Sequence, residues 1–467
     1  MIFGSGTDKP KQMIIEYALF IDILVLVICA TLLVRFGGLS HSHPAVSYLI
    51  FHLITVTFRL ISLANGAPTL FEWYFLPYLI FEPVTHTEII KASLMIDVML
   101  VAMTIGWIHA ATVEKKSKVK DLLRIPQITL SINHIWIVAS ISFLIGILGI
   151  YLYGYVPFIG KSEVDLGDWE SSSWLQITMT WSGLALLALI YSYGFRWWLV
   201  SPMLIYLLIM SVQGYHRFRV VIPIVLLIQI YLDRQRRKWP SLVPTAIACL
   251  VILVFFPLKN IGRSVQMGTN TDEIVIESSE SLAKAFKGEH GDTQILDITA
   301  CAITLVDRSG KFYYGSTYLP LLVAPVPRQL WEEKPGQADH IKEFSTPQRP
   351  MFEMGMVTGF VGDVYLNFWY IGIIVIPYLV AYGLGRFYFK AYRSNYFSVF
   401  RFAYLLIACN LIQVYRDGLM SIVIFTAVNM MPLTIIVMLH WIFPVNRQRE
   451  FSLTTLLPSL QSKRSSS

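Results

Sequence analysis

The chain has 467 residues, of which 55% are hydrophobic and only 14% are charged. A soluble domain carries about 25% charged residues, so this chain has too few polar groups to cover a water-facing surface. Repeated apolar runs of about 18 residues or more are long enough to cross a bilayer as helices. The composition therefore excludes a large soluble protein and predicts an all-α polytopic membrane protein.

The apolar runs indicate about eleven membrane-spanning helices, within a range of roughly 10 to 12. They lie at roughly 14–35, 45–64, 89–111, 132–154, 173–195, 197–213, 218–232, 242–258, 361–385, 397–415 and 419–443. The run at 197–213 is short for a span. The segment 70–83 contains glutamates and prolines, so we expect an interfacial or re-entrant piece there instead of a further span.

Basic residues predict how the chain is oriented, because short cytoplasmic loops carry an excess of Lys and Arg. Alternating the spans places four basic clusters on one side, which we expect to be the cytoplasm. The clusters are Lys115, Lys116, Lys118, Lys120 and Arg124; Arg234, Arg236, Arg237 and Lys238; Arg386, Lys390 and Arg393; and Arg447, Arg449, Lys463 and Arg464. The N-terminus is then outside, the C-terminus is inside, and the net charge of +7 reflects these loops, not nucleic-acid binding.

The predicted organisation has one large loop outside the membrane. It consists of helices 1–8 in 1–258, a non-cytoplasmic loop in 259–360, helices 9–11 in 361–443 and a cytoplasmic tail in 444–467. Within the loop, apolar residues recur at helical spacing at Ile295, Ile298, Ala302 and Leu305. This spacing predicts an amphipathic helix lying on the membrane surface. The proline-rich stretch 318–327 is too short to span.

Several missing motifs narrow the function. The sequence has no P-loop, no HExxH zinc motif and no DxD pair, and its four cysteines form no CxxC pair. We therefore expect no metal and no cofactor. If the protein is an enzyme, its donor substrate is already in the membrane, because no soluble domain is large enough to bind a nucleotide.

Two turns on the outer side carry arginines where few are expected. The turn at 213–219 carries Arg217 and Arg219, and the turn at 413–418 carries Arg416 and Asp417. Arginine beside an apolar segment is costly unless it is paired or binds an anion, and its planar fork grips phosphate. The turns therefore indicate a site for an anionic substrate. The alternative is that the arginines reach lipid headgroups or pair with Asp417, Glu163 or Asp165.

A third segment, 324–335, places Arg328 and Lys334 around Trp331 between prolines. This composition suits either a sugar-and-phosphate environment or a rigid loop held by cation–π contact. Inside the apolar runs, charged side chains also need partners. An Arg59–Asp97 pair is one interpretation, and a polar transport path that includes Asp22 is another.

At these residues the sequence resembles the bacterial oligosaccharide repeat-unit polymerases, the Wzy group, and looks most similar to the enterobacterial common antigen polymerase branch. The stretches that carry the resemblance are Gly214-Tyr-His-Arg217 with the following Phe-Arg-Val-Val-Ile, Pro327-Arg-Gln-Leu-Trp331-Glu-Glu-Lys-Pro335, Gly359-Phe-Val-Gly-Asp363-Val-Tyr-Leu-Asn-Phe and Tyr415-Arg-Asp-Gly-Leu419. They spread over about residues 200–425, whereas the N-terminal half matches only in hydropathy. Either Arg217 or Arg219 could match the family's arginine in the first turn. The second family arginine could be Arg328, Arg308 or Arg263.

The resemblance implies a metal-independent glycosyltransferase of the second GT-C type. It would join undecaprenyl-diphosphate-linked repeat units into an O-antigen or exopolysaccharide chain at the bacterial inner membrane. Arginines would stabilise the diphosphate leaving group, and a base (Asp417, or alternatively His340 or Glu343) would accept the proton of the attacking hydroxyl. The expected catalytic residues are Arg217, Arg219, Arg416, Asp417 and His340, and the expected substrate-binding residues are Tyr215, Arg328, Trp331, Lys334 and Asp363.

The implied partners are lipid-linked glycans, the bilayer, a chain-length regulator and a flippase, with no nucleic acid. Two other classes stay open from the sequence. One is a ligase of the same superfamily that moves the glycan to a lipid or protein acceptor. The other is a flippase or transporter for lipid-linked glycans.

Overall fold

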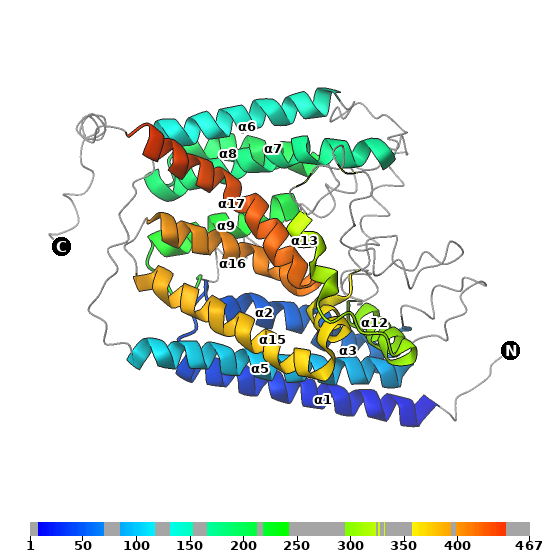
Figure 1. Cartoon of the computed structure of the whole chain (residues 1–467). Helices are drawn as coiled ribbons and strands as arrows, with labels where there is room; N and C mark the ends of the chain where they lie inside the picture. Colours follow the sequence, from blue (N-terminus) through cyan, green and yellow to red (C-terminus); the bar gives the residue numbers. More distant parts are fainter. Residues whose placement is uncertain are drawn as a thin grey trace.

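The computed structural model describes residues 8–69, 85–116, 131–152, 166–212, 218–241, 295–323, 326, 331, 357–393 and 398–444. Every regular element within these ranges is helical, and none is a strand. The long helices run side by side, parallel or antiparallel, in one bundle (Figure 1). This architecture satisfies each backbone polar group within its own helix, which a hydrocarbon environment requires.

The helices follow one another along the chain. In order, they are α1 (Asp8–Leu32), η1 (Leu33–Gly37), α2 (Pro44–His52), η2 (Leu53–Thr57), α3 (Phe58–Ala64), α5 (His86–Lys116), α6 (Ile132–Leu152), α7 (Leu166–Tyr193), α8 (Trp197–Val212), α9 (Phe218–Arg234), α12 (Ile295–Ser309), η3 (Ser316–Tyr318), α13 (Pro320–Val323), α15 (Gly359–Arg393), α16 (Val399–Asp417) and α17 (Leu419–Ile442). Helix η1 continues α1, and α2, η2 and α3 form one continuous helix.

Six described helices are long and apolar enough to cross a membrane. They are Gln12–Gly37, Pro44–Ala64, His86–Lys116, Gly359–Arg393, Val399–Asp417 and Leu419–Ile442, and shorter apolar helices occupy Ile132–Leu148, Ile177–Tyr193 and Trp197–Met210. The protein is thus an α-helical, multi-pass membrane protein. Ten of the eleven predicted runs fall on helices, and the run at 242–258 lies outside the described residues. The segment 70–83 and most of the loop 259–360 lie outside them too.

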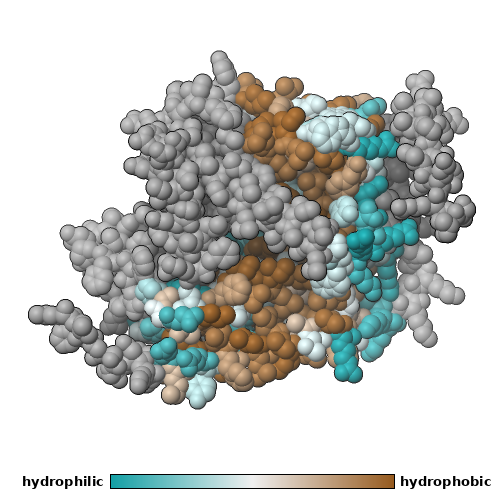
Figure 2. Space-filling view, turned by 180° about the vertical axis from the view of Figure 1, so that it is seen from behind, coloured by the Kyte–Doolittle hydropathy of each residue, from teal (hydrophilic) through white to brown (hydrophobic). Residues whose placement is uncertain are grey.

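The described basic clusters lie at one end of the bundle, on the left in Figure 1. Glu114 at the end of α5 pairs with Arg393 at 2.5 Å and with Arg386 at 3.7 Å. The backbone carbonyl of Lys238 accepts a hydrogen bond from the backbone N–H of His41 at 2.9 Å. Figure 2 shows apolar surface across the middle of the described helices and hydrophilic residues along this end. The described members of the first three clusters, such as Lys116, Lys238 and Arg393, therefore lie at the same end of the bundle.

Helices α5 and α15 pack along each other through small residues. A Cβ on Gly106 would lie 2.5 Å from the carbonyl oxygen of Tyr378, and one on Gly385 would lie 2.8 Å from the Cβ of Ala110. Small residues let helix backbones approach closely, which is the usual basis of helix association inside a membrane. This α5–α15 seam joins helices from the two ends of the sequence.

Helix α15 is broken near its start. Trp369 has φ 55° and ψ −154°, outside the helical region, so the helix changes course there. A non-glycine residue in this region is strained and persists only where its surroundings enforce it. The part before the break is buried and contains Asp363 and Asn367. The break therefore divides α15 into a short buried helix before Trp369 and a long helix after it.

The helix predicted around residues 295–305 is present as α12, and other helices of the protein cover much of it. Most of its residues are buried, including its polar residues Asp297 and Thr299. A helix on a lipid surface exposes a polar face to water, whereas α12 packs against α5 and α15. The spacing correctly indicated a helix with one strongly apolar face. Its burial reflects contacts from distant parts of the chain.

Candidate functional site

Polar side chains gather at the bundle end opposite the basic clusters. We call this end the α12 end: it comprises α12, η3, the first turns of α5 and α15, and the turn between α16 and α17 (Figure 1). Segments from four parts of the sequence meet here. Their polar contacts determine which of the predicted site residues lie together.

Asp363 connects three of these segments. Its Oδ2 accepts a hydrogen bond from the backbone N–H of Leu419 at 2.7 Å and another from the hydroxyl of Tyr318 at 3.2 Å. The carboxyl group therefore caps the N-terminus of α17 while it also holds η3. Burial and the neighbouring Asp363 raise the pKa of Tyr318, which keeps its hydroxyl protonated as a donor. The predicted substrate-binding residue Asp363 is thus only 7% exposed and bound to protein groups.

The turn that Asp363 caps contains two predicted catalytic residues. Nη1 of Arg416 donates to Oδ1 of Asp417 at 2.9 Å, and both side chains are partly exposed. Gly418 then takes φ 93° and ψ −178°, a conformation that favours glycine. A Cβ at this position would lie 2.8 Å from Oδ2 of Asp363. The two stretches around Asp363 and Arg416 therefore form one local structure.

Asn367, one turn after Asp363, holds η3 in place. Its Oδ1 accepts from the backbone N–H of Gly315 at 3.0 Å and from the hydroxyl of Thr317 at 2.9 Å. Its Nδ2 donates to the backbone carbonyl of Asp363 at 2.9 Å. Asp363 and Asn367, in the buried first part of α15, therefore both hold η3, and Asp363 also holds the α16–α17 turn.

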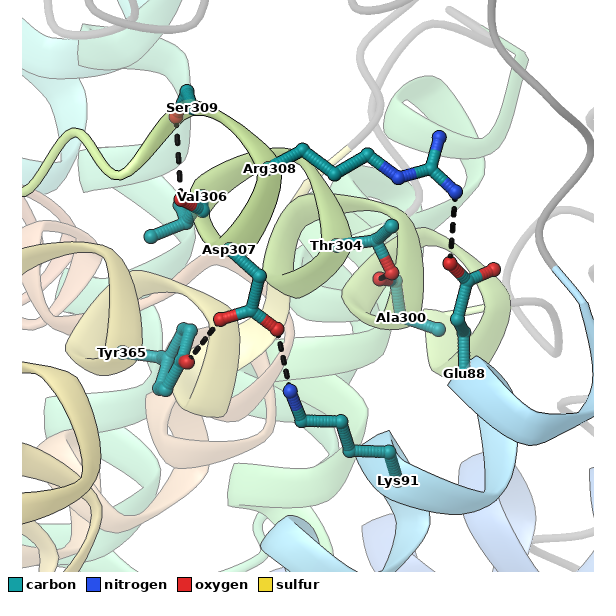
Figure 3. A network of polar contacts seen from close by, with 9 residues as sticks. All are labelled: Glu88, Lys91, Ala300, Thr304, Val306, Asp307, Arg308, Ser309 and Tyr365. Atoms are coloured by element: carbon teal, nitrogen blue, oxygen red, sulfur yellow. Dashed lines mark hydrogen bonds and ion pairs between the residues drawn. The ribbon is translucent and has the colours of Figure 1, made fainter.

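The end of α12 makes a second network with α5 and α15 (Figure 3). Asp307 accepts hydrogen bonds from Nζ of Lys91 and from the hydroxyl of Tyr365. The next residue, Arg308, pairs through Nη2 with Oε1 of Glu88, one turn before Lys91 on α5, at 3.1 Å. Lys91 and Arg308 remain about two-fifths exposed, so their charged groups are accessible at the surface of the described structure. Together with Arg416 they give this end several partly exposed cations.

The other end of α12 is held by a fully buried ion pair. Nε and Nη2 of Arg59 donate to the two carboxylate oxygens of Asp297 at 3.0 and 2.6 Å, and both side chains are 0% exposed. Nη2 also donates to the carbonyl of Pro68 at 2.8 Å. The interpretation that Arg59 pairs with Asp97 is therefore wrong. Asp297 is the partner, and α12 reaches it from more than two hundred positions later in the sequence.

Asp97 lies instead in a buried group with Asp22 and His52, inside the membrane-spanning helices. Nε2 of His52 lies 2.7 Å from Oδ1 of Asp22 and 3.6 Å from Oδ1 of Asp97. The hydroxyl of Thr57 donates to Oδ2 of Asp22 at 2.6 Å. We call the three ionisable residues the Asp22–His52–Asp97 group. His52 was not predicted as a site residue, because in the sequence it is only a single histidine within an apolar run.

The remaining predicted site residues cannot be placed in this geometry. Trp331 lies within the described residues, and it is 42% exposed. Arg219 lies in the first turn of α9, where only its backbone is described. The residues outside the described ranges are Tyr215, Arg217, Arg328, Lys334 and His340, together with the alternative base Glu343. The structure therefore brings together Asp363, Arg416 and Asp417 and leaves the roles of all of these residues as predictions.

Comparison with known proteins adds no assignment. No protein-family model, no curated protein and no solved structure matches the chain. The arrangement at the α12 end must therefore be interpreted from its own chemistry. It offers guanidinium and ammonium groups to an anion, and a carboxylate beside one of those guanidinium groups.

Proposed function

We propose that the protein is a polysaccharide polymerase that joins undecaprenyl-diphosphate-linked oligosaccharide repeat units on the non-cytoplasmic face of a bacterial inner membrane. In this proposal the chain has about eleven spans, belongs to the second GT-C type, and exposes its α12 end outside. The observation that supports it best is the turn Arg416–Asp417–Gly418, which Asp363 caps. Two of the stretches that resemble the polymerases meet in that turn.

The proposed reaction is a displacement at the reducing-end sugar of the growing glycan. A hydroxyl of the incoming repeat unit attacks the anomeric carbon, and the bond between that carbon and the diphosphate oxygen breaks. The lipid diphosphate leaves with additional negative charge. Preorganised arginine donors stabilise that charge, which a metal ion does in many other transferases. Arg416 is the described residue best placed for this role.

The proton of the attacking hydroxyl needs an acceptor. Asp417 is adjacent to Arg416 and partly exposed, so it can serve as a base or hold the guanidinium in position. Asp363 is buried under the turn, and we assign it a positioning role. The spans would hold the two polyprenyl tails, and the segment 259–360 would cover the two glycans.

The test is the length of surface glycan in bacterial cells that depend on this gene. Arg416→Ala should leave single repeat units at the surface while the protein still inserts in the membrane. Arg416→Lys should rescue poorly because lysine lacks the planar fork that binds two phosphate oxygens. Arg237→Ala, an exposed arginine at the opposite end, is the matched control and should give normal chains. Long chains in the Arg416→Ala strain would overturn the proposal.

The same experiment separates the related ligase. A ligase would attach preformed glycan to a lipid or protein acceptor, so its loss would leave long, unattached chains on the lipid carrier. Single repeat units on the carrier therefore support a polymerase, and unattached long chains support a ligase.

A flippase for lipid-linked glycans is the second candidate. The Asp22–His52–Asp97 group favours it, because ionisable residues inside spans often mark ion or substrate paths. Purified protein in vesicles that moves a fluorescent lipid-linked glycan across the bilayer without extending it would support a flippase. Extension of the glycan in the same vesicles would support the polymerase.

A further inference from the structure

We propose that the Asp22–His52–Asp97 group binds one divalent first-row transition-metal ion, of which Zn²⁺ is the probe we would use. The three residues come from α1, α2 and α5, and each lies inside a candidate membrane span, away from its ends. The site is separate from the cations at the α12 end. Its predicted effect is to hold three spans together within the bilayer.

The geometry of the three ligands suits such an ion. One ligand atom from each residue can be chosen so that all of them lie within 4.8 Å of one another. Ligands about 2.1 Å from a tetrahedral zinc ion are about 3.4 Å apart. The distances from Nε2 of His52 to the two carboxylates, 2.7 and 3.6 Å, lie on either side of that value. Small shifts of the side chains would bring the three ligand atoms to this spacing.

Asp97 supplies an independent reason to expect a ligand. It is only 4% exposed, yet neither carboxylate oxygen has a hydrogen-bond partner among the described residues. Its Oδ1 is directed toward His52 at 3.6 Å. A buried carboxylate without a donor is costly, and a cation between it and the other two ligands removes that cost.

The charge balance also favours a divalent ion. With both carboxyl groups ionised and the imidazole neutral, as in a metal-bound state, the group carries a total charge of −2. Within the part of the chain that the structure describes, no Lys or Arg forms an ion pair with any of these three residues. Arg59 pairs with Asp297 instead. One divalent cation makes the group neutral, which is the state that a hydrocarbon environment favours.

The second nitrogen of His52 fits the same arrangement. Metal binding at Nε2 leaves the ring proton on Nδ1, which is buried and has no described partner. His52 also lines a cavity of about 20 Å³, together with Tyr48, Thr55 and Thr299, which is room for one water molecule. A water there would accept the Nδ1 proton, as the outer partners of metal-bound histidines do.

The donor set selects the class of ion. An imidazole nitrogen with two carboxylate oxygens suits zinc, manganese or iron. Calcium takes six to eight oxygen ligands and magnesium retains several waters, and neither is satisfied by this small buried group. Protons compete with a metal ion for imidazole and carboxylate ligands, so the affinity for the ion should fall in acid.

The test uses the full chain in detergent, purified with a tag that contains no histidine, treated with chelator and then dialysed against Zn²⁺. We expect about one tightly held zinc per chain by elemental analysis, and a higher thermal midpoint with Zn²⁺ than with Mg²⁺. X-ray absorption should show nitrogen and oxygen neighbours and no sulfur. Asp97→Asn and His52→Gln should each weaken zinc binding at least about tenfold. His109→Ala removes an exposed histidine from α5 and should leave zinc binding unchanged.

Two results would overturn the proposal, and neither needs a variant to fold. One is wild-type protein that retains no zinc after dialysis and has the same thermal midpoint with and without the metal. The group would then be neutralised by protons. The other is bound zinc whose absorption spectrum shows sulfur ligands, which would locate the ion elsewhere.

Discussion

The carboxylate of Asp363 accepts a hydrogen bond from the backbone N–H of Leu419, 56 positions later in the sequence. This bond fixes where α17 begins, and therefore how the preceding turn presents Arg416. We predict that Asp363→Ala lowers the free energy of unfolding by about 1–2 kcal/mol, because it removes a helix cap and leaves the hydroxyl of Tyr318 without its partner. Thermal unfolding in detergent measures the effect. Asp363→Asn retains an acceptor and should cost less; an equal loss in both variants would contradict a capping role.

Gly418 should tolerate no side chain. Gly418→Ala places a Cβ 2.8 Å from Oδ2 of Asp363 on a backbone with φ 93°, so we expect a loss of at least about 1 kcal/mol and disturbance of the turn. Gly383→Ala is the matched control, because it lies within α15 with open space around it and should be neutral or slightly stabilising. Comparable thermal midpoints for the two variants would contradict the geometry of this turn.

Loss of one partner of the Arg59–Asp297 pair should lower the free energy of unfolding more than loss of one partner of any exposed ion pair among the described residues. Both side chains are fully buried, so removing one leaves an uncompensated charge. We expect Arg59→Met and Asp297→Asn each to lower the free energy of unfolding by about 3–5 kcal/mol. The double variant Arg59→Met/Asp297→Leu should lose less than either single variant, as measured by denaturant or thermal unfolding. Additive losses would show that the two charges do not interact.

The Arg308–Glu88 pair provides the contrast. The side chain of Arg308 is 42% exposed and that of Glu88 is 20% exposed, so water and salt screen their attraction. Arg308→Ala should change the free energy of unfolding by less than about 1 kcal/mol. The difference should shrink further in high salt. A larger loss that is insensitive to salt would place this pair in a less solvated environment than the structure shows.

His43 should make the protein less stable in mild acid. Burial lowers the pKa of His43 to about 3, whereas an unfolded histidine protonates near pH 6.5. The unfolded chain therefore binds the extra proton between these values, and the free energy of unfolding falls as pH drops below 6.5, by up to about 1.4 kcal/mol per pH unit. His43→Asn keeps an acceptor for the N–H of Ala45 and should reduce this pH dependence. His109→Asn, at an exposed position, should not.

Hydropathy alone was enough to predict most of the helices, because a span must bury its backbone polar groups and cover them with apolar side chains. Helical spacing was enough to predict α12. The sequence could not reveal that α12 is buried, because that depends on helices α5 and α15 packing around it. Hydropathy and helical spacing describe a single helix and do not predict which other helices pack against it.

The polar partners were the hardest feature to predict. The sequence suggested Asp97 as the partner of Arg59, whereas Asp297, its actual partner, lay in a segment expected to rest on the membrane surface. No sequence pattern indicated a role for His52, because its possible role depends on two carboxylates that come from other helices. By contrast, the stretches containing Asp363 and Arg416 were singled out by resemblance, and the structure places them in contact through Leu419. The glycan-length experiment tests the proposed role of Arg416 in binding the diphosphate, which Asp363 would support by positioning the turn.

The α5–α15 seam has a consequence for how the protein is made. Ribosomes synthesise α5 well before α15, with more than two hundred residues between them. During that interval the groove around Gly106 has no α15 to fill it and must be occupied by lipid or by another helix. The two helices can pack against each other only after α15 has been synthesised. Truncation anywhere before residue 359 should therefore leave α5 without its partner and expose it to membrane quality-control proteases.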